Sequence, residues 1–405
     1  MRISSRTIFE SGTSQLGTLQ AQLARTQMQL STNKRILTPS DDPIASARAL
    51  EVSQSKSVNE QFGVNRDNAR NSLSMVEQAL GNATSLMQDV KTLVVRAGNA
   101  ALSNADLKSI ADEIEGRMED LLGIANTSDG SGDYLFSGFK TSTQPFTRTS
   151  TGADYNGDQG QREIQVSTSR KLPVSDSGAS VFLGNATGNG RFETRADPGN
   201  AARGGTGIVS TGTAEGTLTN HDYSVSFTVT PAGTTYTVTD DTLGTVVGAP
   251  DQPFKTGEKI AFDGVALDIK GAPANGDKFT VAPTEKRSIF ESMTELVTAL
   301  RAGKTGDGPS AALANSLNKA NENMGNSIDN VLSVRSSVGS RLNEIDYLDS
   351  AGDDLDVQYS GVLSELQDLD MVKAITEFTQ QQFALEAAQK SFKALSGLSL
   401  FNFIG

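Results

Sequence analysis

Apolar residues recur with a helical period in the two outer parts of the chain, residues 44–144 and 310–405, which contain no proline. In the first part the steps alternate between three and four residues: Leu73, Val76, Leu80, Ala83, Met87, Val90, Val94 and Ala97. This alternation predicts a long helix with a narrow, coiled-coil-type stripe. A second helix is expected from Ser103, with Asp106 as the acid of a capping box. Further helices are expected at 289–300 and from near Leu313, so each stripe can pack against the others.

The two ends of the chain carry thinner stripes. Near the N-terminus a large apolar residue recurs every seventh position, with Leu19 between two of them: Phe9, Leu16, Leu23, Leu30 and Leu37. Near the C-terminus the steps are again four and three: Met371, Ile375, Phe378, Gln382, Leu385, Gln389 and Phe392. After the first helix, Asp42 is a suitable N-cap and Pro43 a suitable first helical residue. The corresponding break before the last helix is expected at residues 349–354, DSAGDD.

The middle of the chain predicts β-structure. Nine of the eleven prolines lie between Pro145 and Pro309, and 23 of the 39 glycines lie in residues 129–283. Residues 223–240 alternate apolar and polar side chains in two runs, and Asp263-Gly264 separates two further runs as a hairpin turn. Residues 184–216 are rich in Gly, Asn and Thr, and they fit either a mobile loop or irregular strands. The fold class expected is mainly α with a β insertion.

Composition excludes several classes of function. A net charge of −13 argues against nucleic-acid binding, which needs a clustered basic surface. No apolar run approaches 18 residues, so no membrane span is expected. The N-terminus lacks the apolar core of a secretory signal. Its Arg and Ser content would suit a mitochondrial presequence, but the helical period continues past Arg35 without a break. Without cysteine, disulfides, thiol nucleophiles and thiolate metal sites are excluded.

The residues of enzyme chemistry form no convincing site. The single histidine, His221, lies beside an alternating strand and is interpreted as a surface residue rather than a ligand. The usual catalytic triads need a histidine base, and one histidine without a cysteine leaves little from which to build one. Three acidic pairs, at 41–42, 240–241 and 353–354, fall where aspartate caps turns or helix starts. The glycine-rich DGSGDY and GNATGNG segments lack the flanking strand and helix of a phosphate loop. We therefore predict no enzyme activity, no cofactor and no metal site.

Four aromatic residues fall within residues 134–146, YLFSGFKTSTQPF, after a stretch (101–133) that contains none. They stand where the helical pattern gives way to the β pattern. We expect Tyr134, Phe136, Phe139 and Phe146 to fill the seam between the helical bundle and a β-hairpin. Core packing alone is the favoured interpretation, and direct contact with a neighbouring subunit is the alternative.

Four segments together resemble the flagellin superfamily: TNKRILTPSDDPIASARAL, YLFSGFKTSTQPF, SSVGSRLNEID and ALEAAQKSFKALSGLSLFNFIG. Within that superfamily they are similar to the hook–filament junction proteins of the hook-associated group. The resemblance covers residues 1–148 and 284–405, and the β middle matches only in character. A filament flagellin would show something nearer SSGLRINSAKDDAAG in place of TNKRILTPSDDPIAS. The FNFIG ending departs from the more usual LFDYL-like tail.

The resemblance implies three domains. Residues 1–40 with 355–405 would form a terminal coiled-coil polymerisation domain, 41–148 with 284–354 a helical bundle with a β-hairpin, and 149–283 an outer β-rich domain. The assembly interface would then lie on the terminal helices, at Phe9, Leu16, Leu19, Leu23, Leu30, Met371, Ile375, Phe378, Leu385, Phe392, Leu400 and Phe401.

The function implied is that of a structural adaptor joining the hook-associated protein layer to the flagellin filament. The partners implied are copies of the same chain, a neighbouring hook-associated protein, flagellin, and an export chaperone on the C-terminal helix. Export to the extracellular flagellum would need no cleaved signal peptide. Filament flagellin itself is an alternative. A secreted adhesin or effector with a helical stalk is another, and it would need a receptor site in residues 149–283.

Overall fold

The computed structural model describes residues 5–304 and 310–404, with side chains described at position 7, from 9 to 304 and from 310 to 394. Its long helices flank a β-rich middle, so the predicted fold class is confirmed. The chain divides into two compact units, a terminal unit (residues 1–64 and 347–405) and a central unit (residues 65–346). Both boundaries lie within long helices, α2 (Pro43–Ala97) and α6 (Ala311–Gln367). They therefore differ from the division expected near residues 40 and 355.

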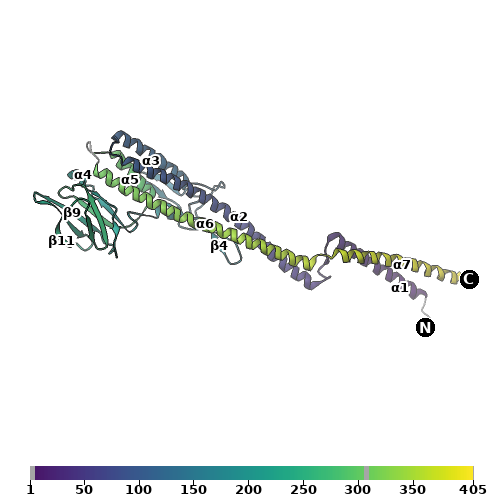
Figure 1. The fold of residues 1–405 in the computed structure, drawn as a ribbon. Helices are drawn as coiled ribbons and strands as arrows, with labels where there is room; N and C mark the ends of the chain where they lie inside the picture. The colour runs from purple at the N-terminus through teal and green to yellow at the C-terminus, as the bar shows by residue number, and fades with distance from the viewer. Residues whose placement is uncertain (1–4, 305–309, 405) are drawn as a thin grey trace. The chain divides into compact units, whose positions relative to one another are not determined.

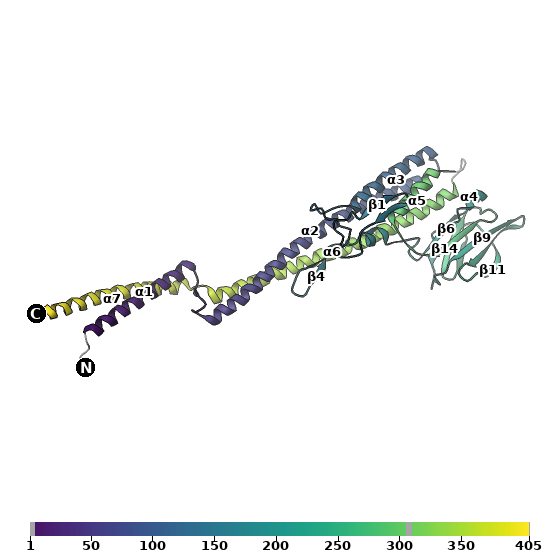
Figure 2. The same ribbon diagram turned by 180° about the vertical axis from the view of Figure 1, so that it is seen from behind.

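In the terminal unit the two ends of the chain pair with each other. Helix α1 (Ser5–Thr32) runs beside α7 (Met371–Ile404), and views from two opposite sides show the two helices next to each other (Figures 1 and 2). The turn after α1 is closed as predicted, because the backbone N–H of Ala45 donates to Asp42 Oδ1 at 3.0 Å and Pro43 is the first residue of α2. An aspartate that accepts this bond satisfies one of the free N–H groups of the helix start.

The break before the last helix lies at residues 368–370, and the prediction of a break at 349–354 was wrong. Helix α6 continues through that segment to Gln367 because Gly352 is buried and its carbonyl accepts a hydrogen bond from Asn59 Nδ2 at 2.8 Å. The aspartates around it therefore lie on a helix. The new helix is instead capped by Asp370, whose Oδ1 accepts from the backbone N–H of Lys373 at 3.0 Å.

The helices of the central unit bury the stripes that the sequence predicts. All eight residues of the α2 stripe, from Leu73 to Ala97, are buried. Helix α3 (Asn104–Ala125) begins with the expected capping box between Ser103 and Asp106. Helix α5 (Ile289–Ala302) packs against α3. The apolar stripe of α6 is also buried except for Leu342, which is half-buried; its buried members are Met324, Ile328, Val331, Val338 and Ile345.

Short β elements cover these helices. The strands β1 (Phe146–Thr149) and β2 (Gly152–Tyr155) pair, as do β3 (Glu163–Gln165) and β4 (Lys171–Pro173). A π-helical turn, η1 (Ala179–Leu183), follows and contacts α5. The β1–β2 hairpin spans the domain boundary expected at residue 149.

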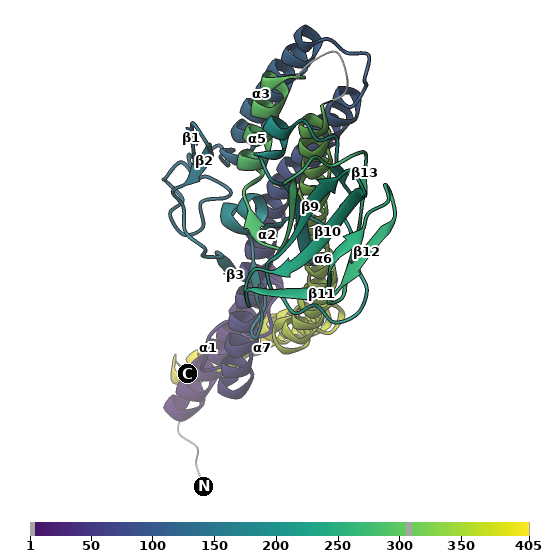
Figure 3. The same ribbon diagram turned by 90° about the vertical axis from the view of Figure 1, so that its left-hand side faces the viewer.

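Most of the remaining strands form a β domain (residues 191–283). One sheet has the order β11-β10-β9-β14-β6, and Figure 3 shows three of its strands next to one another: β9 (Tyr223–Thr230), β10 (Gly233–Asp240) and β11 (Thr245–Pro253). The other two strands of this sheet are β14 (Lys278–Pro283) and β6 (Phe192–Ala196). A second sheet joins β12 (Lys259–Phe262), β13 (Val265–Lys270) and β7 (Ile208–Val209), with β8 (Thr213–Ala214) also paired to β13.

Two local predictions for this domain are confirmed. Strands β9 and β10 form the expected antiparallel pair, and β12 and β13 meet at Asp263-Gly264. Both turn residues have positive φ, 41° and 81°, as the tight hairpin turn requires. Residues 184–216 form irregular short elements, namely β5 (Asn185–Ala186), β6, the single helical turn α4 (Asn200–Arg203), β7 and β8.

Candidate assembly surface

The seam between α1 and α7 is shallow. Leu16, Leu19, Leu23 and Leu30 of α1 are all only half-buried, and so are Phe378, Leu385 and Phe392 of α7. The rings of Phe9 and Phe392 lie 5.1 Å apart. Gly12 makes this packing possible, because a Cβ there would lie 2.7 Å from Phe392 Cδ2. A polar contact across the seam joins Thr26 Oγ1 to Gln381 Oε1, at 2.9 Å.

The outer side of α7 carries apolar side chains that the pair does not cover. Met371 and Ile375 were predicted interface residues, and both are exposed. The side of α7 facing α1 is followed instead by Ala374, Phe378, Leu385 and Phe392, with Ala374 buried. Val372 and Phe383, which the sequence reading missed, are 78% and 74% exposed. The predicted residues Leu400 and Phe401 lie beyond the side chains that the structure describes.

A second uncovered group lies on the parts of α2 and α6 that belong to the terminal unit. The exposed large apolar residues of α2 form two pairs, Ile44 with Val58 and Leu50 with Val64. The residues of each pair are two heptads apart, and a polar residue, Glu51 or Ser57, occupies the heptad position between them. On the part of α6 that belongs to the terminal unit, the exposed large hydrophobic residues are Tyr347, Leu355 and Val357. None of these was predicted as an interface residue. The two-heptad spacing within each α2 pair is a weak signal, because the apolar repeat is interrupted.

Together these residues make the terminal unit unlike the central one. Of the 19 exposed large hydrophobic residues that the structure describes, 13 lie in the terminal unit, which holds fewer than a third of the residues. The buried apolar residues described in that unit are three alanines: Ala45, Ala49 and Ala374. We call the 13 residues the assembly surface: Phe9, Met28, Ile44, Leu50, Val58, Val64, Tyr347, Leu355, Val357, Met371, Val372, Ile375 and Phe383. This concentration of exposed large apolar side chains in one unit makes it the candidate site of protein–protein association.

Polar contacts fix the turns that connect these helices. The backbone N–H of Arg35 donates to the carbonyl of Gln367 at 2.7 Å, and that of Leu369 donates to the carbonyl of Asn33 at 3.2 Å. Asp41 accepts from the backbone N–H groups of Thr38 and Leu37 and lies 2.8 Å from Arg25. These hydrogen bonds, that of Thr38 above all, hold the pKa of Asp41 below its ordinary value. The connection between the two chain ends is therefore ordered by its own residues.

The predicted aromatic seam is built from two of its four expected members. Phe136 and Phe146 are fully buried, and each meets the ring of Phe182 edge-on, at centroid distances of 5.4 and 5.5 Å. Phe290 of α5 completes the cluster, 5.3 Å from Phe146. Tyr134 is half-buried, and Phe139 lies outside the cluster with 65% of its surface exposed. Phe182 and Phe290 were missed because they lie far along the chain from residues 134–146.

A tyrosine closes the edge of this cluster. The ring of Tyr155 lies 5.1 Å from that of Phe146, and its hydroxyl donates between the carbonyl oxygens of Asp158, at 2.7 Å, and Phe136, at 2.9 Å. Burial, with a smaller contribution from the charge of Asp158, raises the pKa of Tyr155 to about 12. The hydroxyl therefore keeps its proton and its hydrogen bond at any physiological pH.

The described residues hold no catalytic arrangement. His221 is paired through Nδ1 with Asp240 Oδ2 at 2.7 Å, and Asp240 also accepts from the backbone N–H groups of Thr242 and Leu243. Within the ranges described, no three histidine or acidic side chains come close enough to share a metal ion. No described helix is both long and apolar enough to cross a membrane.

Comparison with known proteins shows which family has this architecture. The bacterial flagellin N-terminal helical region matches residues 3–141, and the D2-like domain of flagellar hook-associated protein 1 matches residues 199–283. The flagellar junction protein FlgL of Legionella pneumophila is 30% identical, with a TM-score of 0.72 over 79% of this chain and 100% of that one. The chain belongs to the FlgL family of flagellar junction proteins.

Other relatives agree with this assignment. FlgL of Xanthomonas campestris is 30% identical, with a TM-score of 0.71 over 77% of this chain and 99% of that one. Flagellar hook-associated protein 3 of Escherichia coli (strain K12) is 28% identical over 404 residues, which are 99% of each chain. Members of the family are structural components of the flagellum. Family membership therefore confirms the prediction that the chain is not an enzyme.

Proposed function

We propose that the chain is a structural adaptor of the bacterial flagellum that joins a layer of hook-associated protein to the flagellin filament. Its membership of the junction-protein family supports this function. The adaptor acts by assembly, in which helices of one copy cover apolar surface on its neighbours. No covalent bond is made or broken in the process.

The observation that carries the proposal is the assembly surface of the terminal unit. Burying a leucine or phenylalanine side chain fully gains about 1.5–3 kcal/mol, and 13 such large apolar residues stand exposed in this unit. A helix pair cannot bury two sides of the same helix. Neighbouring molecules can, because they approach from outside, and the gain on burial is then available to hold the layer together.

The partners proposed follow from this surface and from the family. They are further copies of the chain within the junction layer, an adjoining hook-associated protein, and flagellin. An export chaperone would cover α7 before assembly, since this helix exposes Val372, Ile375 and Phe383. We place the mature protein in the extracellular flagellum, exported without a cleaved signal peptide. Nucleic acid and membrane are not among its proposed partners.

Deletion of the gene tests the function against its alternatives. Electron microscopy of the deletion strain should show hooks without filaments, and flagellin should appear in the culture medium. If the chain were filament flagellin, the deletion would remove flagellin from the medium as well. If it were an adhesin or effector, the deletion strain would carry normal filaments.

A pair of substitutions tests the surface itself. Phe383→Ser removes a 74%-exposed ring from the assembly surface, and Leu243→Ser removes a 63%-exposed side chain from the turn after β10. Neither change opens a core, so both proteins should melt like the wild type. We expect Phe383→Ser to restore few or no filaments to the deletion strain and Leu243→Ser to restore them fully. Normal filaments with Phe383→Ser would remove α7 from the proposed interface.

A further inference from the structure

The β domain joins the helices through a two-stranded neck. Its strands, β5 and β15 (Lys286–Arg287), pair antiparallel. Above them the backbone N–H of Thr187 donates to the carbonyl of Glu285 at 3.0 Å, and the hydroxyl of Thr284 donates to the carbonyl of Thr187 at 2.9 Å. The two connections therefore brace each other. A single-stranded linker would leave the domain free to swing.

Asparagines of α6 bind the backbone of this neck. Asn326 Nδ2 donates to the carbonyls of Ala186 and Gly188 at 2.9 and 2.7 Å. Asn323, which is 3% exposed, accepts from the backbone N–H of Gly188 at 3.3 Å. One turn further on, Asn330 Nδ2 lies 3.1 Å from Asn185 Oδ1 in β5 and also donates to the carbonyls of residues 180 and 181 in η1, each at 2.9 Å. Backbone groups are fixed in space, so these bonds set both the position and the direction of the neck.

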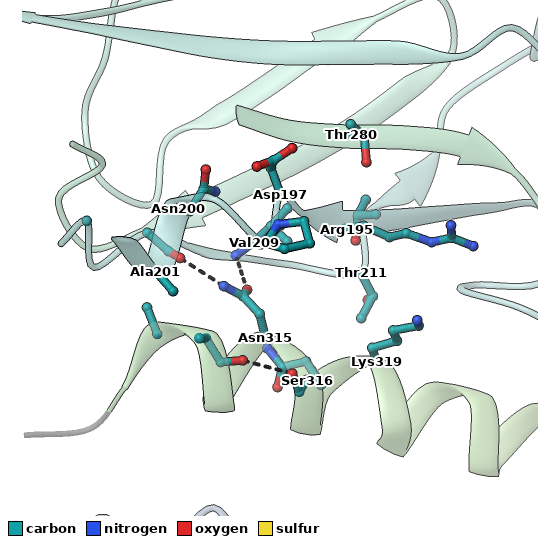
Figure 4. Close-up of a pocket in the computed structure, with 18 of the residues that line it drawn as sticks. Arg195, Asp197, Asn200, Ala201, Val209, Thr211, Thr280, Asn315, Ser316 and Lys319 are labelled. Atoms are coloured by element: carbon teal, nitrogen blue, oxygen red, sulfur yellow. Dashed lines mark hydrogen bonds between the residues drawn. The ribbon is translucent and has the colours of Figure 1, made fainter. Parts of the chain in front are cut away.

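A fourth asparagine reaches the β domain at a separate point. Asn315 Oδ1 accepts from the backbone N–H of Val209 at 3.0 Å, and its Nδ2 donates to the carbonyl of Gly207 at 3.0 Å (Figure 4). The side-chain amide therefore makes the same two hydrogen bonds with the backbone at β7 that a neighbouring strand would make, one as donor and one as acceptor. Asn315 and Asn326 are eleven positions apart on α6, which corresponds to about 16 Å along the helix axis. Two attachments at that spacing oppose rotation as well as translation.

A charge cluster lies between the two attachments. Lys319 Nζ is 2.7 Å from Glu295 Oε2 and 3.8 Å from Glu193 Oε1. Glu193 is only 1% exposed, and it also pairs with Arg195. Burial alone would raise the pKa of Glu193, but the hydrogen bond and charge of Arg195 and the charge of Lys319 outweigh it and lower that pKa. Separating the β domain from α6 would weaken the pairing of a buried carboxylate, which is unfavourable.

Apolar packing contributes little to this attachment. The hydrophobic core of the β domain consists entirely of residues between 192 and 281, with no helical side chain among its described members. Beside the asparagines, between the domain and α6, lies a cavity of about 570 Å³. Its lining includes Arg195, Asp197, Asn200 and Lys319 (Figure 4). Directional hydrogen bonds therefore have to supply the orientation that a packed apolar seam would otherwise give.

We propose that Asn315, Asn323, Asn326 and Asn330, the asparagine rail, lock the β domain to the helical bundle in one orientation. Asparagine is a poor helix former, yet residues 315–330 contain six of them. The four of the rail are those whose amides bind backbone outside the helix. If the proposed adaptor function holds, the consequence is that load applied to the β domain passes directly into α6.

The test replaces a rail amide with a carboxylate of the same shape. Asn326→Asp loses the two N–H donors and turns an oxygen toward two carbonyl oxygens. Asn318→Asp is the matched control, because Asn318 is exposed on the same helix. The chain contains no cysteine, so spin labels can be placed at Ser109→Cys on α3 and Thr228→Cys on β9. Electron double resonance then gives the distribution of distances between bundle and domain in the dilute, unassembled protein.

We expect one narrow distribution in the wild type and in Asn318→Asp, and a distribution about twofold or more wider in Asn326→Asp, as for a released hinge. A second label pair within the β domain, at Thr228 and Lys255, should stay narrow in every variant. If the distance distribution of this second pair broadens in Asn326→Asp, that substitution has disturbed the β domain itself. The test then uses Asn315→Asp, whose side chain binds at β7, in place of Asn326→Asp. An equally narrow distribution in the deciding rail variant, or a broad one in the wild type, would overturn the proposal. Neither result depends on assembly, so the adaptor function can fail or stand separately.

Discussion

At the scale of single residues, the aromatic seam shows what sequence reading can and cannot reach. The sudden appearance of four aromatics identified the place where helix meets β-structure, and Phe136 and Phe146 are buried there. Their partners Phe182 and Phe290 come from segments about 40 and 140 residues away, and only the folded chain brings them together. Phe139 belongs to the same aromatic run but lies outside the cluster. Outside regular helices and strands, closeness in sequence does not show which side chains share a face.

The seam gives a prediction for one missed residue. Phe182 is 1% exposed and touches three other rings, so Phe182→Ala should lower the free energy of unfolding by about 3–5 kcal/mol. Phe139→Ala, at an exposed position, should change it by no more than about 0.5 kcal/mol. Denaturant melts of both variants, followed by far-UV circular dichroism, compare the two. Equal, small effects would mean that the ring cluster does not stabilise the bundle.

At the scale of elements, a strict apolar period predicted the helices better than local helix-breaking residues predicted where the helices end. The α2 stripe alternates three and four residues over 25 positions and is buried throughout, because only one face of a helix can satisfy such a pattern. The DSAGDD segment failed as a break because the glycine is buried at a close contact with α2. The asparagines of α6 were overlooked because their partners are backbone groups, which leave no mark in the sequence.

The elements also predict where the β domain can be removed. Deleting residues 191–283 joins Gly190 to Thr284, which the neck already holds close to each other. The bundle should keep its helical circular dichroism and a cooperative melt. Deleting 150–283, from near the boundary expected from sequence, also removes Phe182, Tyr155 and the β3–β4 hairpin, and it should lower the melting temperature markedly. Equal melting of the two deletion proteins would show that residues 150–190 contribute nothing to the bundle.

At the scale of the whole molecule, the two units differ in how they are stabilised. The central unit buries large residues such as Leu73, Met87 and Ile114 completely, whereas the buried apolar residues described in the terminal unit are alanines. Ordering a residue costs about 1–2 kcal/mol of backbone entropy. Half-buried leucines in a two-helix seam return only part of the 1.5–3 kcal/mol or so that full burial gives. The terminal unit therefore depends on neighbouring molecules for a large part of its stability.

This difference predicts a transition on assembly. In dilute monomer, α1 and α7 should exchange their amide hydrogens far faster than α2 from residue 70 onward, and limited proteolysis should trim both ends to a core near residues 40–355. In assembled junctions the same amides should be protected, because neighbours then cover Phe383, Ile375 and Phe9. The central unit is the internal control, since its exchange should be alike in both states. Strong protection of α1 and α7 in a verified monomer would mean that the shallow Phe9–Phe392 seam is sufficient by itself, and that the exposed face of α7 is not needed to hold these helices together.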